Sequence, residues 1–165
     1  MAITIIGIDP GLSGGIAWIQ GGQLLSAVRI PTVQAGKKTL LDESEIRALL
    51  KDWVGESYVY IEQVSAMPKQ GVASMFTFGT GWGFLRGVVV GLGIGYSMVR
   101  PQAWQKEILA GVAGKDSKGA AYLYASRRWP SFKWLATDRS KKPHDGMIDA
   151  ACIAAYGERE RHESR

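Results

Sequence analysis

Two carboxylates in this sequence stand where a buried strand is expected to end. Asp9 directly follows the apolar run TIIGI, and Glu62 directly follows the apolar run YVYI. Each residue has an ordinary structural interpretation, because Asp9 before Pro-Gly is a common turn signal and Glu62 before a loop can simply be solvated. Placed together at the ends of neighbouring strands, however, the same two side chains would form part of one site.

Two further acids lie near the C-terminus. Asp145 and Asp149 are four residues apart in a segment that reads as a helix, so they share one of its faces. Asp145 alone could be the N-cap of that helix. Asp149 is harder to explain structurally, since MI precedes it and AACIAA follows it. A carboxylate in apolar surroundings needs a cation, because otherwise its pKa rises and it becomes neutral.

The available ligands favour a hard cation. The chain has one cysteine, Cys152, and two histidines, so the sequence contains no cluster typical of a soft-metal site. Oxygen ligands suit Mg²⁺ or Mn²⁺. Two such ions held by carboxylates are the usual machinery for hydrolysing phosphodiesters.

Composition narrows the class of protein. The 165 residues suit one domain, and the net charge of +5 favours an anionic partner, most commonly nucleic acid. The lone cysteine excludes an internal disulfide framework. The N-terminus shows no secretory pattern, and the longest uncharged run, at 87–99, is too short to cross a bilayer. We therefore expect no membrane association and an intracellular location, either cytoplasmic or at the nucleoid. A virus or an organelle could equally encode the protein.

The pattern of apolar residues predicts an α/β fold with a mixed sheet flanked by helices. Strands are expected at 4–9, 16–20, 24–30, 58–62 and 94–99, with an exposed, mobile loop over 31–41. Helices are expected after a cap at Asp42 or Ser44, then over about 72–92, from Pro101, over 116–129, and over 145–157. Gly157 is expected to end the last helix, so residues 1–157 form one domain and 158–165 a charged, disordered tail.

Three segments in this order resemble a known family. GIDPGLSGGIA (7–17), YIEQV (60–64) and HDGMIDAACIAAYG (144–157) look like the three catalytic segments of the RuvC family of Holliday-junction resolvases. The segments FGTGWGFLRGVVVGL, VRPQAWQKEI and GKDSKGAA extend the likeness, which runs from Ile3 to Tyr156. The resemblance implies an RNase H-like fold with a five-stranded mixed sheet. It also implies an endonuclease that makes paired, symmetric nicks in four-way DNA junctions during recombination and repair.

The resemblance assigns the four acids a catalytic role. It implies that Asp9, Glu62, Asp145 and Asp149 bind two Mg²⁺ ions, for which Mn²⁺ substitutes. Many family members space the last two acids three apart instead of four, so His144 is a candidate to share the role of Asp145. The expected products carry a 5′-phosphate and a 3′-hydroxyl.

Other residues are candidates for DNA contact. Lys118 best matches the family's basic helix, and it is expected both to bind DNA and to support the transition state. The full set of expected phosphate contacts is Lys69, Arg100, Lys106, Lys115, Lys118, Lys141 and Lys142. Many members carry an aromatic residue that opens the junction, at a position where this chain has SAMP. The candidates for that role here are Met67, Phe76 and Phe78.

The resemblance also implies a homodimer, because two cuts must be placed symmetrically across a junction. Gly83, Gly87 and Gly91 recur every four residues and are candidates for the dimer contact, unless they pack against the protein's own sheet. A branch-migration helicase is a further candidate partner. Three alternative functions remain open: an actin- or sugar-kinase-type ATPase, an RNase H-like nuclease that cuts flaps or RNA–DNA hybrids, and a catalytically silent junction-binding protein.

Overall fold

The computed structural model describes residues 3–65 and 71–163 of the chain. Its strands are β1 (Thr4–Asp9), β2 (Gly15–Gln20), β3 (Gln23–Arg29), β4 (Thr32–Ala35), β5 (Lys38–Leu41), β6 (Ser57–Glu62) and β7 (Gly95–Val99). Its helices are α1 (Glu43–Lys51), α2 (Val72–Gly91), α3 (Pro101–Ile108), α4 (Ser117–Arg128) and α5 (Asp145–Glu163). The predicted α/β class is confirmed, and the strands and helices expected from sequence all form.

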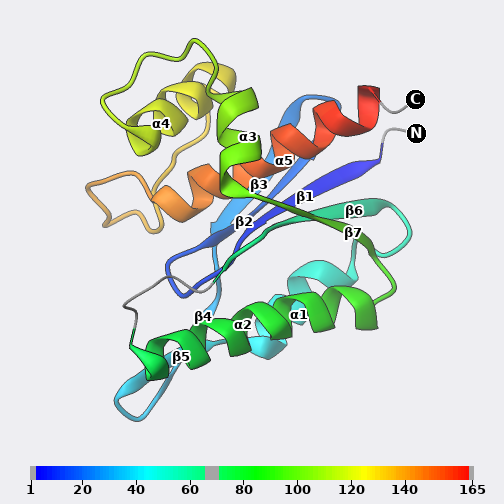
Figure 1. Ribbon diagram of the computed structural model, residues 1–165, viewed down its shortest axis with the longest axis vertical. Helices are drawn as coiled ribbons and strands as arrows, with labels where there is room; N and C mark the ends of the chain where they lie inside the picture. Colours follow the sequence, from blue (N-terminus) through cyan, green and yellow to red (C-terminus); the bar gives the residue numbers. More distant parts are fainter. Residues whose placement is uncertain (1–2, 66–70, 164–165) are drawn as a thin grey trace.

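Five strands form a mixed sheet in the order β3-β2-β1-β6-β7. The pairs β1–β2 and β2–β3 are antiparallel, whereas β6 runs parallel to both β1 and β7. Figure 1 shows α1 and α2 below this sheet and α3, α4 and α5 above it. The sheet therefore lies in the middle of three layers, which is the arrangement that the apolar strand pattern requires.

Alternate residues of each strand face opposite layers. Ile5 of β1 belongs to the core shared with α5, whereas Ile6 and Ile8 belong to the core shared with α1 and α2. Tyr60 of β6 faces α5 in the same way. The face that each side chain of the site occupies follows directly from this alternation.

The segment 31–41 is not the irregular loop that the sequence predicts. It forms an antiparallel hairpin in which Thr32 pairs with Leu41 and Ala35 with Lys38. Gly36 supplies a positive φ of 63° at the tip, which a two-residue turn requires. The segment is exposed as expected, and its short, polar strands lack the apolar runs by which the other strands were predicted.

The last helix does not end at Gly157 but continues to Glu163. Gly157 lacks a side chain because the Tyr60 ring packs against it, and not because the helix terminates there. The next turns are anchored, since the Glu158 carboxylate accepts a hydrogen bond from the Gly22 backbone N–H at 2.7 Å. The Arg161 guanidinium lies 4.0 Å from the centre of the Tyr58 ring. Residues 158–163, expected to belong to a disordered tail, are therefore helical.

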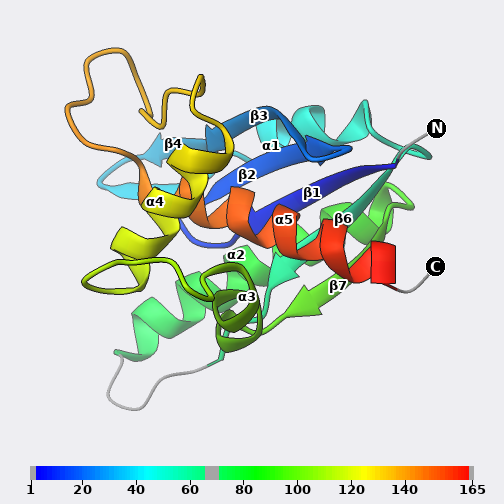
Figure 2. The ribbon, with the colours of Figure 1, turned by 90° about the horizontal axis from the view of Figure 1, so that it is seen from above.

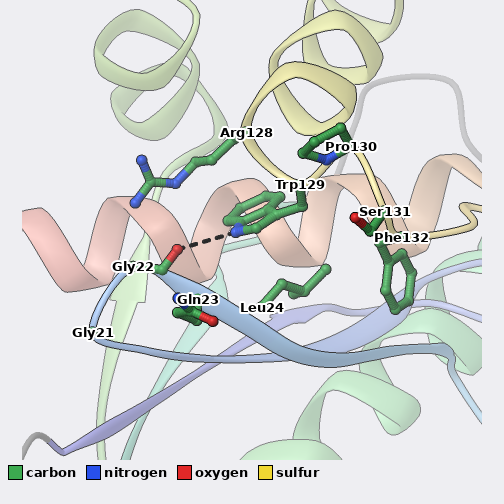
Figure 3. Close-up of a pocket in the computed structure, with 9 residues that line it drawn as sticks. All are labelled: Gly21, Gly22, Gln23, Leu24, Arg128, Trp129, Pro130, Ser131 and Phe132. Carbon is green, nitrogen blue, oxygen red and sulfur yellow. Dashed lines mark hydrogen bonds between the residues drawn. The ribbon is translucent and has the colours of Figure 1, made fainter.

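The β2–β3 turn also binds the end of α4. Figure 3 shows the indole of Trp129 beside this turn, with Nε1–H donating to the Gly22 carbonyl at 3.1 Å. Arg128 lies 3.7 Å from Glu158, which ties α4 to α5 at the same point. These contacts fix the helical layer that carries two of the four acids.

Candidate active site

Asp9 and Glu62 are placed at one level and on one face of the sheet. Ile8 lies opposite Ile61 in the parallel β1–β6 pair, so the next residue of each strand is one of the two acids. Each acid is two positions beyond a residue that faces α5, namely Gly7 in β1 and Tyr60 in β6. Strand periodicity therefore directs both carboxylates toward α5.

Glycines allow α5 to approach the sheet closely. A side chain at Gly7 would overlap the backbone of Ala150 and Ala154, and one at Gly146 would overlap the backbone of Ser13 and Gly14. Because these positions lack side chains, the first turns of α5 lie directly on β1 and on the β1–β2 turn. Figures 1 and 2 both place the start of α5 at the end of the molecule where β1 ends. Asp145 and Asp149 are thereby brought to the same end as Asp9.

His144, and not Asp145, caps the last helix. The His144 Nδ1 accepts a hydrogen bond from the Met147 backbone N–H at 3.2 Å, and the His144 carbonyl accepts from the Ile148 N–H at 3.2 Å. Burial lowers the pKa of His144, which keeps Nδ1 available as an acceptor. The N-cap interpretation of Asp145 is therefore wrong, and the carboxylate of Asp145 is free for other contacts.

Electrostatics show that the four acids lie near one another. Burial, followed by the charges of Glu62 and Asp149, raises the pKa of Asp9 well above its usual range. Burial, followed by the charges of Glu62 and Asp145, raises the pKa of Asp149 to about 7. Mutual repulsion among ionised carboxylates costs free energy, and a bound cation would relieve it.

Glu62 is held in place by tryptophan. The Trp104 Nε1–H donates to the Glu62 Oε1 at 2.8 Å, and the Trp82 Nε1–H donates to the Glu62 carbonyl at 3.2 Å. Burial raises the pKa of Glu62, and the hydrogen bond from Trp104 partly offsets this rise. Sequence reasoning missed both tryptophans. Trp104 is almost fully buried, and a buried indole N–H needs a hydrogen-bond acceptor. The only signal in the sequence that Trp104 would bind a polar group was therefore the presence of an indole at the fourth position of the predicted helix.

Lys118 is the only one of the predicted basic residues for which the described structure shows a contact with a site acid. Its Nζ lies 2.8 Å from the Asp145 Oδ2, and both side chains are more than half exposed. This hydrogen bond raises the pKa of Lys118. The Asp116 side chain caps α4 by accepting from the Gly119 N–H at 2.8 Å, which places Lys118 in the first turn.

The donor set suits a hard divalent ion. It consists of carboxylates only, three of them with raised pKa values that a cation would lower. Within residues 3–65 and 71–163, however, no three acidic, cysteine or histidine side chains converge closely enough to hold an ion as they stand. The chemistry of the residues therefore fits Mg²⁺, and binding would require the carboxylates to draw together, with Asp145 leaving Lys118.

The other residues predicted to contact DNA or to open the junction lie in several parts of the structure. Lys115 and Lys118 lie at the start of α4, and Lys141 and Lys142 lie in the segment that leads into α5. Arg100 immediately precedes α3, and Lys106 lies on that helix and is exposed. Lys69 and Met67 lie outside the described residues. Phe76 is 76% exposed on α2, whereas Phe78 is 37% exposed, and a side chain added at Gly11 would meet its ring at 3.3 Å.

The glycine face of α2 is open. A side chain added at Gly83, Gly87 or Gly91 would meet nothing within 4 Å, so these residues do not pack against the protein's own sheet. Val72, Phe76 and Val90 are also exposed, by 83%, 76% and 58%. Helical spacing places these apolar residues on the same side as Gly83 and Gly87.

No helix in the described part of the chain is long and apolar enough to cross a membrane.

Comparison with known proteins identifies the fold. No family model matches the sequence, and neither does any curated protein sequence. Among solved structures, RuvC of Thermus thermophilus is 17% identical, with a TM-score of 0.58 over 98% of this chain and 97% of that one. T. thermophilus RuvC in complex with a Holliday junction substrate is 13% identical, with a TM-score of 0.58 over 97% and 96%.

The yeast mitochondrial Holliday junction resolvase Ydc2 is also similar, at 13% identity and a TM-score of 0.53 over 96% of this chain and 78% of that one. All three neighbours cover almost the whole of this chain, which agrees with the mixed sheet and its flanking helices. The chain therefore has the RNase H-like fold of the RuvC Holliday-junction resolvases.

Proposed function

We propose that this protein is a Holliday-junction resolvase, a metal-dependent endonuclease that cuts four-way DNA junctions. The observation that carries the proposal is the group of four electrostatically coupled acids at the end of β1, on the fold of a protein whose structure includes a bound junction. An RNase H-like fold alone would be compatible with other substrates. The likeness to two junction resolvases favours the four-way junction over flaps or hybrids.

Each part of the site has a separate task in this proposal. Asp9, Glu62, Asp145 and Asp149 bind Mg²⁺, or Mn²⁺ in its place, and two bound ions would supply an activated water and stabilise the leaving 3′ oxygen. Trp104 keeps the carboxylate of Glu62 oriented. Lys118, released from Asp145, is positioned to neutralise charge on the scissile phosphate. The exposed lysines around the acids, namely Lys115, Lys141 and Lys142, contact the DNA backbone.

The active unit in this proposal is a homodimer. The open face of α2 carries exposed apolar side chains around Gly83 and Gly87, and glycines allow the backbones of two helices to approach closely. A two-fold pair of α2 helices would present two sites to a two-fold substrate. Gly87→Leu should therefore shift sedimentation toward the monomer and reduce paired cutting. Ser74→Leu, an exposed position on the other side of the same helix, is the matched control and should remain dimeric.

The activity can be tested directly. Labelled four-way junctions, flaps, RNA–DNA hybrids and linear duplexes are incubated with the protein, with and without Mg²⁺. We expect paired nicks in the four-way junction only, and only with the metal, and we expect the nicked ends to be ligatable. Preferential cutting of hybrids or flaps would instead identify a different RNase H-like nuclease. Junction binding without cutting in Mg²⁺ or Mn²⁺ would identify a silent binding protein.

A further inference from the structure

The central sheet carries an exposed arginine, Arg29, at the level of the acids. Gly15 of β2 pairs with Asp9 on one side and with Arg29 of β3 on the other, so all three residues share the face toward α5. Two strand spacings, roughly 10 Å, separate Arg29 from Asp9. Arg29 also lies near the start of α5, since burial lowers the pKa of His144, the charge of Asp145 raises it, and the charge of Arg29 lowers it further. A cation outside the predicted set therefore lies beside the acids.

Shortly after Arg29 the chain leaves the central sheet and forms the β4–β5 hairpin. This hairpin is a separate two-stranded sheet, and Figures 1 and 2 both place it at the end of the molecule where α5 begins. Leu41 joins it to the core shared with α1 and α2, and the Gln34 Nε2–H donates to the Thr39 Oγ1 at 2.9 Å across its two strands. A two-stranded hairpin is at most marginally stable by itself, so these contacts are needed to keep it ordered.

The tip of the hairpin is basic, and one of its faces is apolar. Lys37 and Lys38 are both exposed, and in the described part of the chain neither of them, nor Arg29, forms an ion pair. Val33 and Leu40 pair directly across the two strands and are 47% and 41% exposed. Three cations without a counter-charge at one end of the molecule attract a polyanion, and the major groove of DNA admits a two-stranded ribbon of this kind.

We propose that Arg29 and the β4–β5 hairpin form a binding surface for one duplex arm of the junction. Arg29 binds a phosphate close to the acids, and Lys37 and Lys38 bind phosphates farther along the arm. Each four-residue strand of the hairpin spans about 13 Å, so the tip lies roughly four base pairs from Arg29 along the duplex. Because α4 lies above the sheet and the hairpin below it (Figure 1), the DNA is held from both sides of the acids. This proposal rests on the proposed resolvase function.

The salt dependence of binding tests the hairpin without requiring cleavage. The affinity for a four-way junction is measured at a fixed Ca²⁺ concentration and at several KCl concentrations. Each lost phosphate contact lowers the slope of log K against log [salt] by about 0.9. Lys37→Gln and Lys38→Gln should therefore each lower the slope by about that amount, and the double variant by nearly twice that amount.

Lys51→Gln is the matched control for the hairpin variants. Lys51 is an exposed lysine in the last turn of α1, and the chain continues from there to Ser57, which pairs with Thr4 at the end of the sheet opposite the acids. Lys51→Gln makes the same change of charge as Lys38→Gln, and its slope should equal that of the natural protein. An unchanged slope in the double variant, or an equal drop in Lys51→Gln, would overturn the proposal.

Neutral phosphates locate the contact on the arm. Junctions with a single methylphosphonate, moved one position at a time along each arm, are titrated under the same conditions. For the natural protein, one or two positions several base pairs from the crossover should weaken binding roughly two- to fivefold, the size of an exposed ion pair. Those positions should have no further effect in the double variant, and Arg29→Gln should abolish only the effect of a position closer to the crossover.

Cutting of the same junction in Mg²⁺ is measured separately with the natural protein. Absence of cutting with intact binding would refute the resolvase function but not the arm contact, which the methylphosphonate profile decides. A profile that is the same in the natural protein and the double variant would overturn the arm contact even if the junction is cut. Absence of junction binding by the natural protein would overturn both.

Discussion

The two faces of the central sheet are built in different ways. The face toward α1 and α2 is filled by large aliphatic side chains such as Ile6, Ile8 and Leu85, which are fully buried. The face toward α5 combines large side chains such as Ile5 and Tyr60 with glycines, and α5 approaches most closely at Gly7 and Gly146. Burying large apolar groups gives stability, whereas small residues let a helix approach the strands closely. The α5 face gives up packing volume so that four carboxylates can be brought together.

Loss of a single acid should have the largest effect. We expect Asp9→Asn or Asp149→Asn to lower the cleavage rate by about a thousandfold or more, because each removes a charge needed to hold the metal. Junction binding measured by gel shift should not weaken, since the basic residues contact the phosphates. Asp138→Asn, an exposed acid in the segment before α5, is the control and should cut normally. Near-normal cutting by Asp9→Asn or Asp149→Asn would refute the role of these carboxylates.

The close approach of α5 can be tested by the same small substitution at a tightly packed position and at an open position. Gly146→Ala should lower the free energy of unfolding by about 2–3 kcal/mol, because the added methyl overlaps the backbone at Ser13 and Gly14. Gly79→Ala on α2 meets nothing within 4 Å, and it should raise stability by up to about 1 kcal/mol because alanine favours a helix. Urea titration measures both. Equal effects would mean that α5 is not packed tightly at Gly146.

The charge on the α5 face should make the metal-free protein less stable at neutral pH. In the folded protein the pKa of Asp149 is raised to about 7, whereas it is about 4 in an unfolded chain. Ionisation therefore favours the unfolded chain, and the stability contributed by the protonated carboxyl is lost as the pH rises from about 4 to 7.

Asp149→Asn removes this penalty. In EDTA at pH 8 the variant should be more stable than the natural protein by about 1–2 kcal/mol, less than the full shift because Asp149 is only partly buried. At pH 5 the difference should be small, and Mg²⁺ at pH 8 should stabilise the natural protein more than the variant. Urea titrations at the two pH values measure these differences. A variant that is less stable at pH 8 would show that the carboxylate stabilises the fold.

The smallest effect is expected for Lys118→Ala. The single-turnover rate at saturating enzyme should fall roughly tenfold, because the lysine is needed most when the phosphate gains charge. Lys115 is a nearby exposed lysine without a carboxylate partner in the described structure. Lys115→Ala should weaken junction binding and reduce the salt dependence of binding, but it should leave the saturating cleavage rate unchanged. If Lys118→Ala also left the saturating rate unchanged, Lys118 would be a backbone contact only.

Sequence reasoning predicted the strands of the central sheet correctly. Apolar runs mark where β1 and β6 end, whereas the shared level of Asp9 and Glu62 depends on the parallel pairing of the two strands. The hairpin at 31–41 was missed because its strands are short and polar. The length of α5 was missed because Gly157 looks like a helix end, and only the Tyr60 ring, distant in sequence, explains it. Trp104 and the His144 cap depend on tertiary contacts that no local pattern reveals.

The packing of α5 on β1 also constrains when the site can exist. These two elements lie at opposite ends of the sequence, so their contact closes a loop of more than a hundred residues. Contacts of such high sequence separation form late, because the entropy of closing the loop must be lost first. On the ribosome, the strands with Asp9 and Glu62 emerge long before Asp145 and Asp149. A growing chain therefore has only half of the acids, and the complete carboxylate cluster assembles only once the last helix has been synthesised and has docked.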